Sequence, residues 1–61
     1  MRIPQEHREY LAEVFREKGP RNAAMYLGIG RTALLGILAR GECMPGTAAL
    51  VREAVARRAA A

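Results

Sequence analysis

Glycine and proline residues divide this chain into short segments, and this division constrains the fold more than any other feature of the sequence. Glycine ends helices because it adopts a positive φ without a steric clash, whereas proline suits the first turn of a helix, where its missing N–H is not needed. Such residues stand at Gly19-Pro20, at Gly28 and throughout residues 41–46. The sequence therefore predicts a single all-α domain, residues 1–61, with four short helices at about 4–18, 20–27, 31–40 and 47–58.

The first predicted helix has an apolar stripe along one side. Its members recur at the spacing of one helical face, namely Ile3, His7, Tyr10, Leu11, Val14 and Phe15. The four glutamates of this segment, at positions 6, 9, 13 and 17, indicate a solvated face rather than a catalytic pair. Because Pro20 directly follows Gly19, we expect the next helix to start at once and to cross the first at a steep angle.

Residues 20–40 have the pattern of a helix-turn-helix. Ala23 and Ala24 are small, so a second helix can approach closely over them. Gly28 is placed to end the first of the two helices with a left-handed residue, after which Ile29 turns back toward the core.

The second helix of this pair is predicted to have one apolar and one open face. Its apolar side is formed by Leu34, Ile37 and Leu38, at helical spacing. The other side is then left to Arg31, Thr32, Leu35, Gly36 and Arg40. This second face is the candidate surface for binding a ligand.

The last segment is predicted to be a short helix that docks on the others. Residues 41–46 form a loop, and Thr47 is placed to cap the helix that follows. Its buried face is predicted to contain Leu50, Val51, Ala54 and Val55. No segment alternates with period two next to a hairpin turn, so no sheet is expected.

Composition excludes several kinds of site. With Cys43 as the one cysteine and His7 as the one histidine, neither an internal disulfide nor a zinc cluster can form, and no metal or cofactor is expected. Residues 28–33 match a dinucleotide fingerprint, but no strand precedes them, so we expect no small-molecule ligand and no enzymatic activity. There is no membrane-spanning apolar run and no secretion signal, which predicts a cytoplasmic protein without a membrane partner.

The net charge of +4 is concentrated in the central segment. Residues 1–19 contain four basic and four acidic residues, which cancel. Residues 20–41 contain Arg21, Arg31 and Arg40 and no acid, whereas residues 42–61 contribute only one net positive charge. Uncompensated positive charge on one surface is typical of polyanion binding, although a solvated arginine surface without a ligand is the alternative.

The chain resembles the phage Cro-type repressors and the wider Xre-like helix-turn-helix family, over roughly residues 9–55. Members of that family are similar in having alanine at the fifth place of the motif, glycine at the ninth and an aliphatic residue at the tenth. They also have apolar residues at the fifteenth and eighteenth places. This sequence has Ala24, Gly28, Ile29, Leu34 and Ile37 there. Fis-like domains share a pattern matched by residues 23–31, but they are expected to have a longer connection before it, so they rank second.

The resemblance implies a transcriptional regulator, a Cro-like repressor of a phage or prophage associated with the bacterial nucleoid, that binds double-stranded DNA as a homodimer. It implies that residues 31–39 lie in the major groove of a pseudopalindromic operator. The base-contacting places are then Arg31, Thr32, Leu35 and Gly36, and the phosphate-contacting residues are Arg21, Asn22 and Arg40.

The chain departs from the family pattern at several positions. Pro20 replaces a frequent glutamine and has no N–H to offer to a phosphate, and Gly30 replaces a capping serine or threonine. Leu35 and Gly36 stand where many relatives have polar base readers. Leu35 either contacts thymine methyl groups or extends the core, and we place the core interpretation first.

The competing interpretation is a helical protein-interaction module, such as an antitoxin or adaptor, without specific DNA binding. It would present Leu35, Met44 and the C-terminal face to a protein partner.

Overall fold

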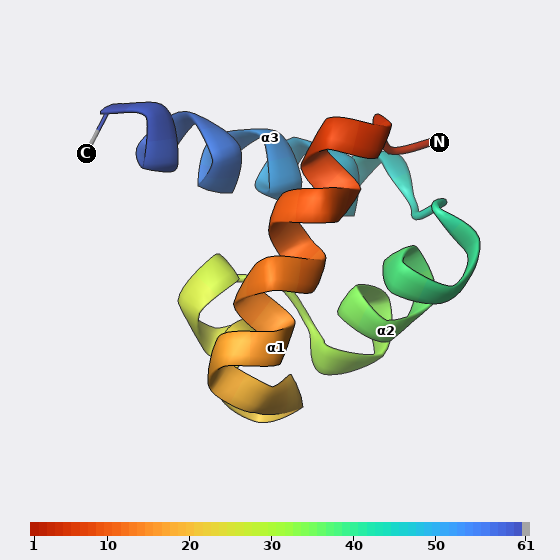
Figure 1. Cartoon of the computed structure of the whole chain (residues 1–61). Coiled ribbons are helices and arrows are strands. Elements are labelled where there is room, and N and C mark those ends of the chain that lie inside the picture. The colour runs from red at the N-terminus through yellow and green to blue at the C-terminus, as the bar shows by residue number, and fades with distance from the viewer. Residues whose placement is uncertain (61) are drawn as a thin grey trace.

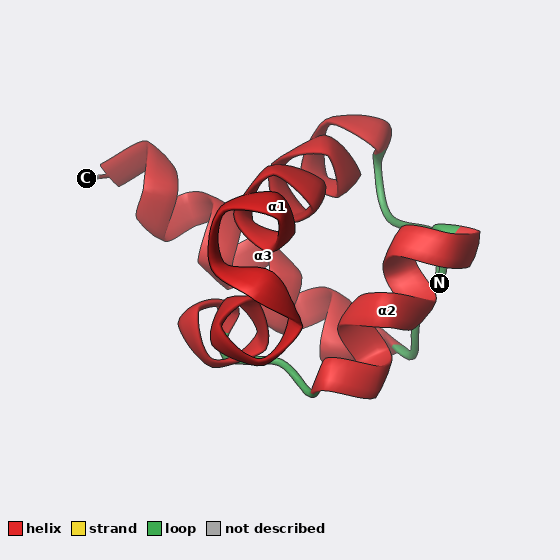
Figure 2. Cartoon of the chain, turned by 60° about the horizontal axis from the view of Figure 1, so that its bottom comes forward, coloured by secondary structure: helices red, strands yellow, loops and turns green. Residues whose placement is uncertain are grey.

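The fold is a set of three helices joined by short turns, shown in Figure 1. The computed structural model describes the backbone of residues 1–60 and the side chains of residues 1–58. The helices are α1 (Gln5–Leu27), α2 (Arg31–Arg40) and α3 (Pro45–Ala60), and Figure 2 shows how little of the chain lies outside them. Residues 1–60 contain no strand, which confirms the predicted all-α class.

The structure has three helices and not the predicted four, because predicted helices 4–18 and 20–27 are joined across a kink at Gly19 into α1. Gly19 lies inside α1 with φ 82° and ψ 167°, and Pro20 follows it inside the same helix. This backbone conformation is open almost exclusively to glycine, and its extended ψ is the one a following proline favours. The sequence located the break, but α1 bends there and continues as a second arm, residues 20–27.

The core consists of apolar residues from all three helices and from the segments between them. Its largest fully buried side chains are Leu11, Leu27, Leu34, Ile37 and Val51, and among the described residues no polar or charged residue is fully buried. Ala23 and Ala24 are buried as well, as expected for small residues that allow a close helix approach. Most of the stripe predicted for the first helix is confirmed, with His7 and Phe15 only half-buried.

The turn between α1 and α2 follows the sequence prediction closely. Gly28 caps α1 with φ 74° and ψ 27°, in the left-handed region. Its N–H donates to the carbonyl oxygen of Ala24 at 2.9 Å, and the N–H of Ile29 donates to the same oxygen at 3.1 Å. Ile29 is buried, so the chain is anchored on both sides of the turn, and α2 leaves α1 at a bend of 116°.

The helix α3 differs from its prediction in both its start and its buried face. It begins at Pro45, and the N–H of Ala48 donates to the carbonyl oxygen of Met44 at 3.0 Å, so Thr47 lies inside the helix and does not cap it. Proline is suited to such a first position. Leu50, predicted to be buried, is 41% exposed, because α3 packs mainly on α1 and one neighbour covers only a narrow stripe. That stripe contains Ala48, Val51 and Ala54.

The segment before α1 pairs with the segment after α2, which the sequence did not reveal. The N–H of Ile3 donates to the carbonyl oxygen of Gly41 at 2.8 Å, and the N–H of Cys43 donates to that of Met1 at 2.9 Å. The α-amino group of Met1 also donates to the carbonyl oxygen of Cys43 at 2.7 Å. These bonds form an isolated antiparallel bridge between residues 2 and 42, and they hold Ile3 in the core.

Replacing Gly19 by alanine is expected to lower the free energy of unfolding by about 1–3 kcal/mol, the usual cost of a sparsely populated backbone conformation. No atom lies within 4 Å of the added Cβ position, so the loss would come from the backbone alone. Gly46→Ala is the matched control, since its Cβ also meets open space but it lies within α3. It should raise stability by about 0.4–1 kcal/mol. Urea unfolding measures the free energy of unfolding of both variants. A decrease of equal size in the two would contradict the role of the bend.

Candidate nucleic-acid interface

The exposed face of α2 is formed by Arg31, Thr32, Leu35, Ala39 and Arg40. The opposite side is anchored in the core by Leu34 and Ile37, which are fully buried. The predicted division of α2 into a core side and an open side is therefore confirmed. At its start, Gly30 provides no side-chain cap to α2. The first N–H groups of α2 have no partner within the helix, and such groups favour an anion.

A hollow of about 560 Å³ adjoins the start of α2. Arg21, from the second arm of α1, and Arg31, the first residue of α2, both line it. The remaining lining residues are Ala24, Met25, Gly28 and Ile29, so no acidic side chain takes part. Arg21 was predicted to contact phosphates and Arg31 to contact bases, but the structure places both beside one hollow.

Leu35 belongs to the exposed face of α2, being 44% exposed. The core interpretation, which the sequence placed first, was therefore wrong. The reason is positional: Leu34 and Ile37 already fill the side of α2 that faces α1, and Leu38 occupies its half-buried edge.

Gly36 does not present a bare helix surface. An added Cβ at Gly36 would lie 2.8 Å from Nη2 of Arg40, so the guanidinium group of Arg40 folds back over this glycine. Gly36 is accordingly half-buried. Any molecule approaching the middle of α2 meets Arg40 there.

A second hollow, of about 280 Å³, lies on the other flank of α2. Thr32, Gly36 and Arg40 line it together with Glu42 and Met44, among others. The carboxylate of Glu42 opposes binding of a phosphate in this hollow. The acid-free hollow beside Arg21 and Arg31 is therefore the better anion site of the two.

The predicted phosphate-contacting residues are all at the surface. Arg21, Asn22 and Arg40 are exposed, and Arg21 and Asn22 follow directly on the bend of α1. None of the side-chain hydrogen bonds formed by the described residues involves them. Asn22 does not line the hollow that Arg21 and Arg31 share.

Met25 and Met44 are exposed beside α2; the sequence analysis named Met44 as a surface for a protein partner but missed Met25. They are 72% and 77% exposed. Met25 follows Arg21 by four residues, so a helical projection of the second arm would have put the two on one side. Met44 precedes α3, and only the fold brings it beside α2.

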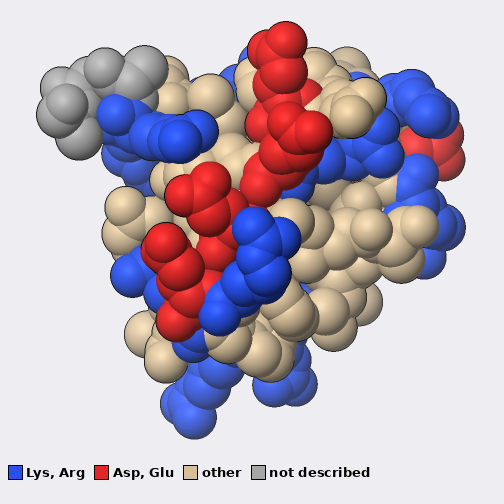
Figure 3. Space-filling view, in the orientation of Figure 1, with Lys and Arg blue, Asp and Glu red and all other residues tan. Residues whose placement is uncertain are grey.

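Acidic charge occupies a different face of the molecule. Figure 3 shows acidic side chains gathered along α1, with basic side chains both beside them and at the edges of this face. The four glutamates of α1 are all exposed, as expected for a solvated stripe. The hollow at the start of α2, which no acidic side chain lines, is therefore more favourable for a polyanion than this stripe.

In residues 1–58, no three side chains of the His, Cys, Asp or Glu type come together as metal ligands. No single helix within the described chain is long and apolar enough to cross a membrane, and only α1 and α2 taken together, across their bend, reach that length and apolarity. Cys43 is a free, half-buried thiol.

No known family model, characterised protein or solved structure matches this chain. The resemblance to Cro-type repressors therefore rests on the motif residues alone.

Substitution of Leu34 and Leu35 by alanine should separate the two sides of α2. Leu34→Ala empties a fully buried site and should destabilise the fold by about 2–5 kcal/mol. Leu35→Ala should cost less than about 1 kcal/mol, because the side chain is already partly in water. Urea unfolding followed by circular dichroism tests the pair, and a loss of several kcal/mol for Leu35→Ala would show that it serves the core.

Proposed function

We propose that this protein is a sequence-specific regulator that binds double-stranded DNA with α2 in the major groove. The observation that carries the proposal is the exposed face of α2, held away from α1 by a three-residue turn and a bend of 116°. The major groove is about 12 Å wide and admits one α-helix. Residues 20–41 contain three arginines and no acid, and all three arginines lie at or beside this face.

A backbone phosphate would bind in the hollow between Arg21 and Arg31. Guanidinium groups match the geometry of phosphate oxygens, and the N–H groups at the uncapped start of α2 support the same anion. Asn22, next to Arg21, would contact the neighbouring phosphate. These contacts fix the register of α2 in the groove.

Base contacts would come from the exposed face of α2. Thr32 and Leu35 would contact thymine methyl groups, with Thr32 also able to donate a hydrogen bond. Arg31 is placed to reach a guanine edge as well as the phosphate hollow. Arg40, folded over Gly36, would meet the bases or the backbone at the far end of α2.

Dimerisation would place two copies of α2 on one operator. A helix of this length covers only a few base pairs, so one copy gives little specificity. Two copies related by a two-fold axis would bind half-sites about 34 Å apart. The operator is then pseudopalindromic.

The competing function is a protein-interaction module, and the exposure of Leu35 and Met44 is the observation in its favour. A partner protein would cover these apolar side chains. Selection of binding sites from random duplexes decides between the two, because a basic protein-binding module attracts duplex DNA through its charge alone but selects no sequence.

Binding to mixed-sequence duplex DNA should be detectable at low salt and should weaken steeply as salt is raised. Arg21→Ala should weaken binding to all sequences alike and reduce the slope of log affinity against log salt by about one unit. Arg52→Ala removes the same charge from α3 and should leave the slope unchanged. Gel-shift titrations at several salt concentrations measure these values, and undetectable binding at low salt would rule out the proposed function.

Selection of binding sites from random duplexes should yield two related half-sites, and Arg31→Ala should relax preference at one position in each. Loss of a guanine contact costs about 1–3 kcal/mol of discrimination. Unchanged selectivity in Arg31→Ala would leave Arg31 as a phosphate ligand only. Selected sites without any internal symmetry would count against the dimer.

A further inference from the structure

A second basic hollow lies between α1 and the C-terminal part of α3. It measures about 200 Å³ and is lined by Tyr10, Tyr26, Ala54, Arg57 and Arg58. The two tyrosines come from the two arms of α1, so the bend at residue 19 brings them to one place. Figures 1 and 2 both show this end of α3 on the side of the molecule remote from α2.

Both arginines of this hollow are exposed, and each contacts another part of the protein. Nη2 of Arg57 donates to the carbonyl oxygen of Leu27, at the end of α1, at 3.5 Å. The guanidinium carbon of Arg58 lies 4.6 Å from the centroid of the Tyr10 ring. Side chains already held in this way lose less conformational entropy when a ligand binds.

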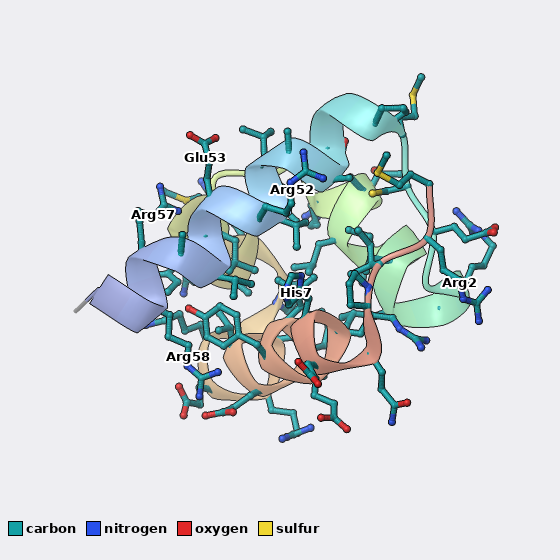
Figure 4. All side chains as sticks on the ribbon, turned by 90° about the horizontal axis from the view of Figure 1, so that it is seen from above. Arg2, His7, Arg52, Glu53, Arg57 and Arg58 are labelled. Carbon is teal, nitrogen blue, oxygen red and sulfur yellow. The ribbon has the colours of Figure 1, made fainter. Side chains whose placement is uncertain are left out.

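The surroundings of the hollow are cationic. Besides the two arginines, Nζ of Lys18 lies 4.5 Å from the centroid of the Tyr26 ring. The sequence placed Glu53 four residues before Arg57, at ion-pair spacing, yet Arg57 bonds to Leu27 instead. Figure 4 shows Glu53 directed to the opposite side of α3 from Arg58. No acidic side chain lines the hollow.

The phenol of Tyr10 adds a neutral donor. Burial raises the pKa of this phenol above its ordinary value and neighbouring Tyr26 raises it further, while Arg58 and Arg57 lower it in part. The Tyr10 hydroxyl is therefore protonated at neutral pH, where its hydrogen bond with Tyr26 links the two phenols.

We infer that the hollow formed by Tyr10, Tyr26, Arg57 and Arg58 binds a phosphate group. Two guanidinium groups supply charge and paired N–H donors, and the two linked phenols supply an O–H donor, which together match a tetrahedral dianion. Pockets that enclose drug-sized ligands measure about 300–1,000 Å³, so this smaller hollow suits a phosphate group rather than a whole nucleotide.

The phosphate belongs to a small molecule, either inorganic phosphate or a phosphomonoester. A duplex seated on the exposed face of α2 lies on the other side of the molecule, so its backbone does not reach this hollow. The site goes beyond the proposed DNA binding and does not depend on it. It also departs from the sequence expectation that no small-molecule ligand binds.

The test is an NMR titration of the ¹⁵N-labelled full chain with inorganic phosphate at constant ionic strength, with chloride as the reference anion. Phosphate should cause saturable shifts of the backbone amides of Tyr26, Arg57 and Arg58. Arg58→Gln should weaken binding about tenfold or more, because a hydrogen bond to a charged group is typically worth at least that factor. Tyr26→Phe, which removes only the hydroxyl, should weaken it by a smaller factor.

The matched control is Arg52→Gln, which removes one charge from α3 outside the hollow and should retain wild-type affinity. Circular dichroism establishes that each variant is folded. Shifts that do not saturate, equal shifts with chloride, or equal losses in Arg52→Gln and Arg58→Gln would overturn the site.

A second measurement identifies the source of the phosphate. Arg58→Gln should bind duplex DNA with unchanged affinity and salt slope if the phosphate comes from a small molecule. A slope reduced by about one unit would instead assign the contact to the DNA backbone and overturn the small-molecule assignment. Saturable phosphate binding by a protein that binds no duplex would support this site and contradict the proposed DNA binding.

Discussion

The bend of α1 at Gly19 determines how the rest of the chain packs. A straight helix of 23 residues would be about 35 Å long, at 1.5 Å per residue. The longest dimension of the molecule is only 25 Å. By bending, α1 turns its second arm back, so that Leu11 and Val14 of the first arm and Leu27 of the second join the same core.

The sequence predicted the features that depend on neighbouring residues. The left-handed cap at Gly28 and the inward turn of Ile29 follow from backbone sterics within a few residues, and the buried side of α2 follows from helical periodicity. Both were correct. The break at Gly19 was located for the same reason, although glycine alone did not reveal whether the helix would end or bend.

The features that the sequence missed depend on contacts between distant segments. Leu50 was predicted to be buried because it shares a helical face with Val51, Ala54 and Val55, but the width of the stripe that α1 covers decides its exposure. The position of Arg40 over Gly36 depends on a side-chain conformation that no periodicity encodes. The hollow beside Tyr10 requires both arms of α1 and α3 at once, so no local motif indicated it.

The hydrogen bonds that join residues 1–3 to residues 41–43 have a consequence for the order of folding. Most helical contacts of the chain are local, and such contacts form within microseconds to milliseconds. The N–H of Ile3 must find Gly41, and that of Cys43 must find Met1, across a large part of the chain, so these pairings carry a larger loop-closure entropy than the turns and the contacts within helices. We therefore expect them to form after the turns and helices. Their opening would release the C-terminal end of α2 while the buried side of that helix stays in the core.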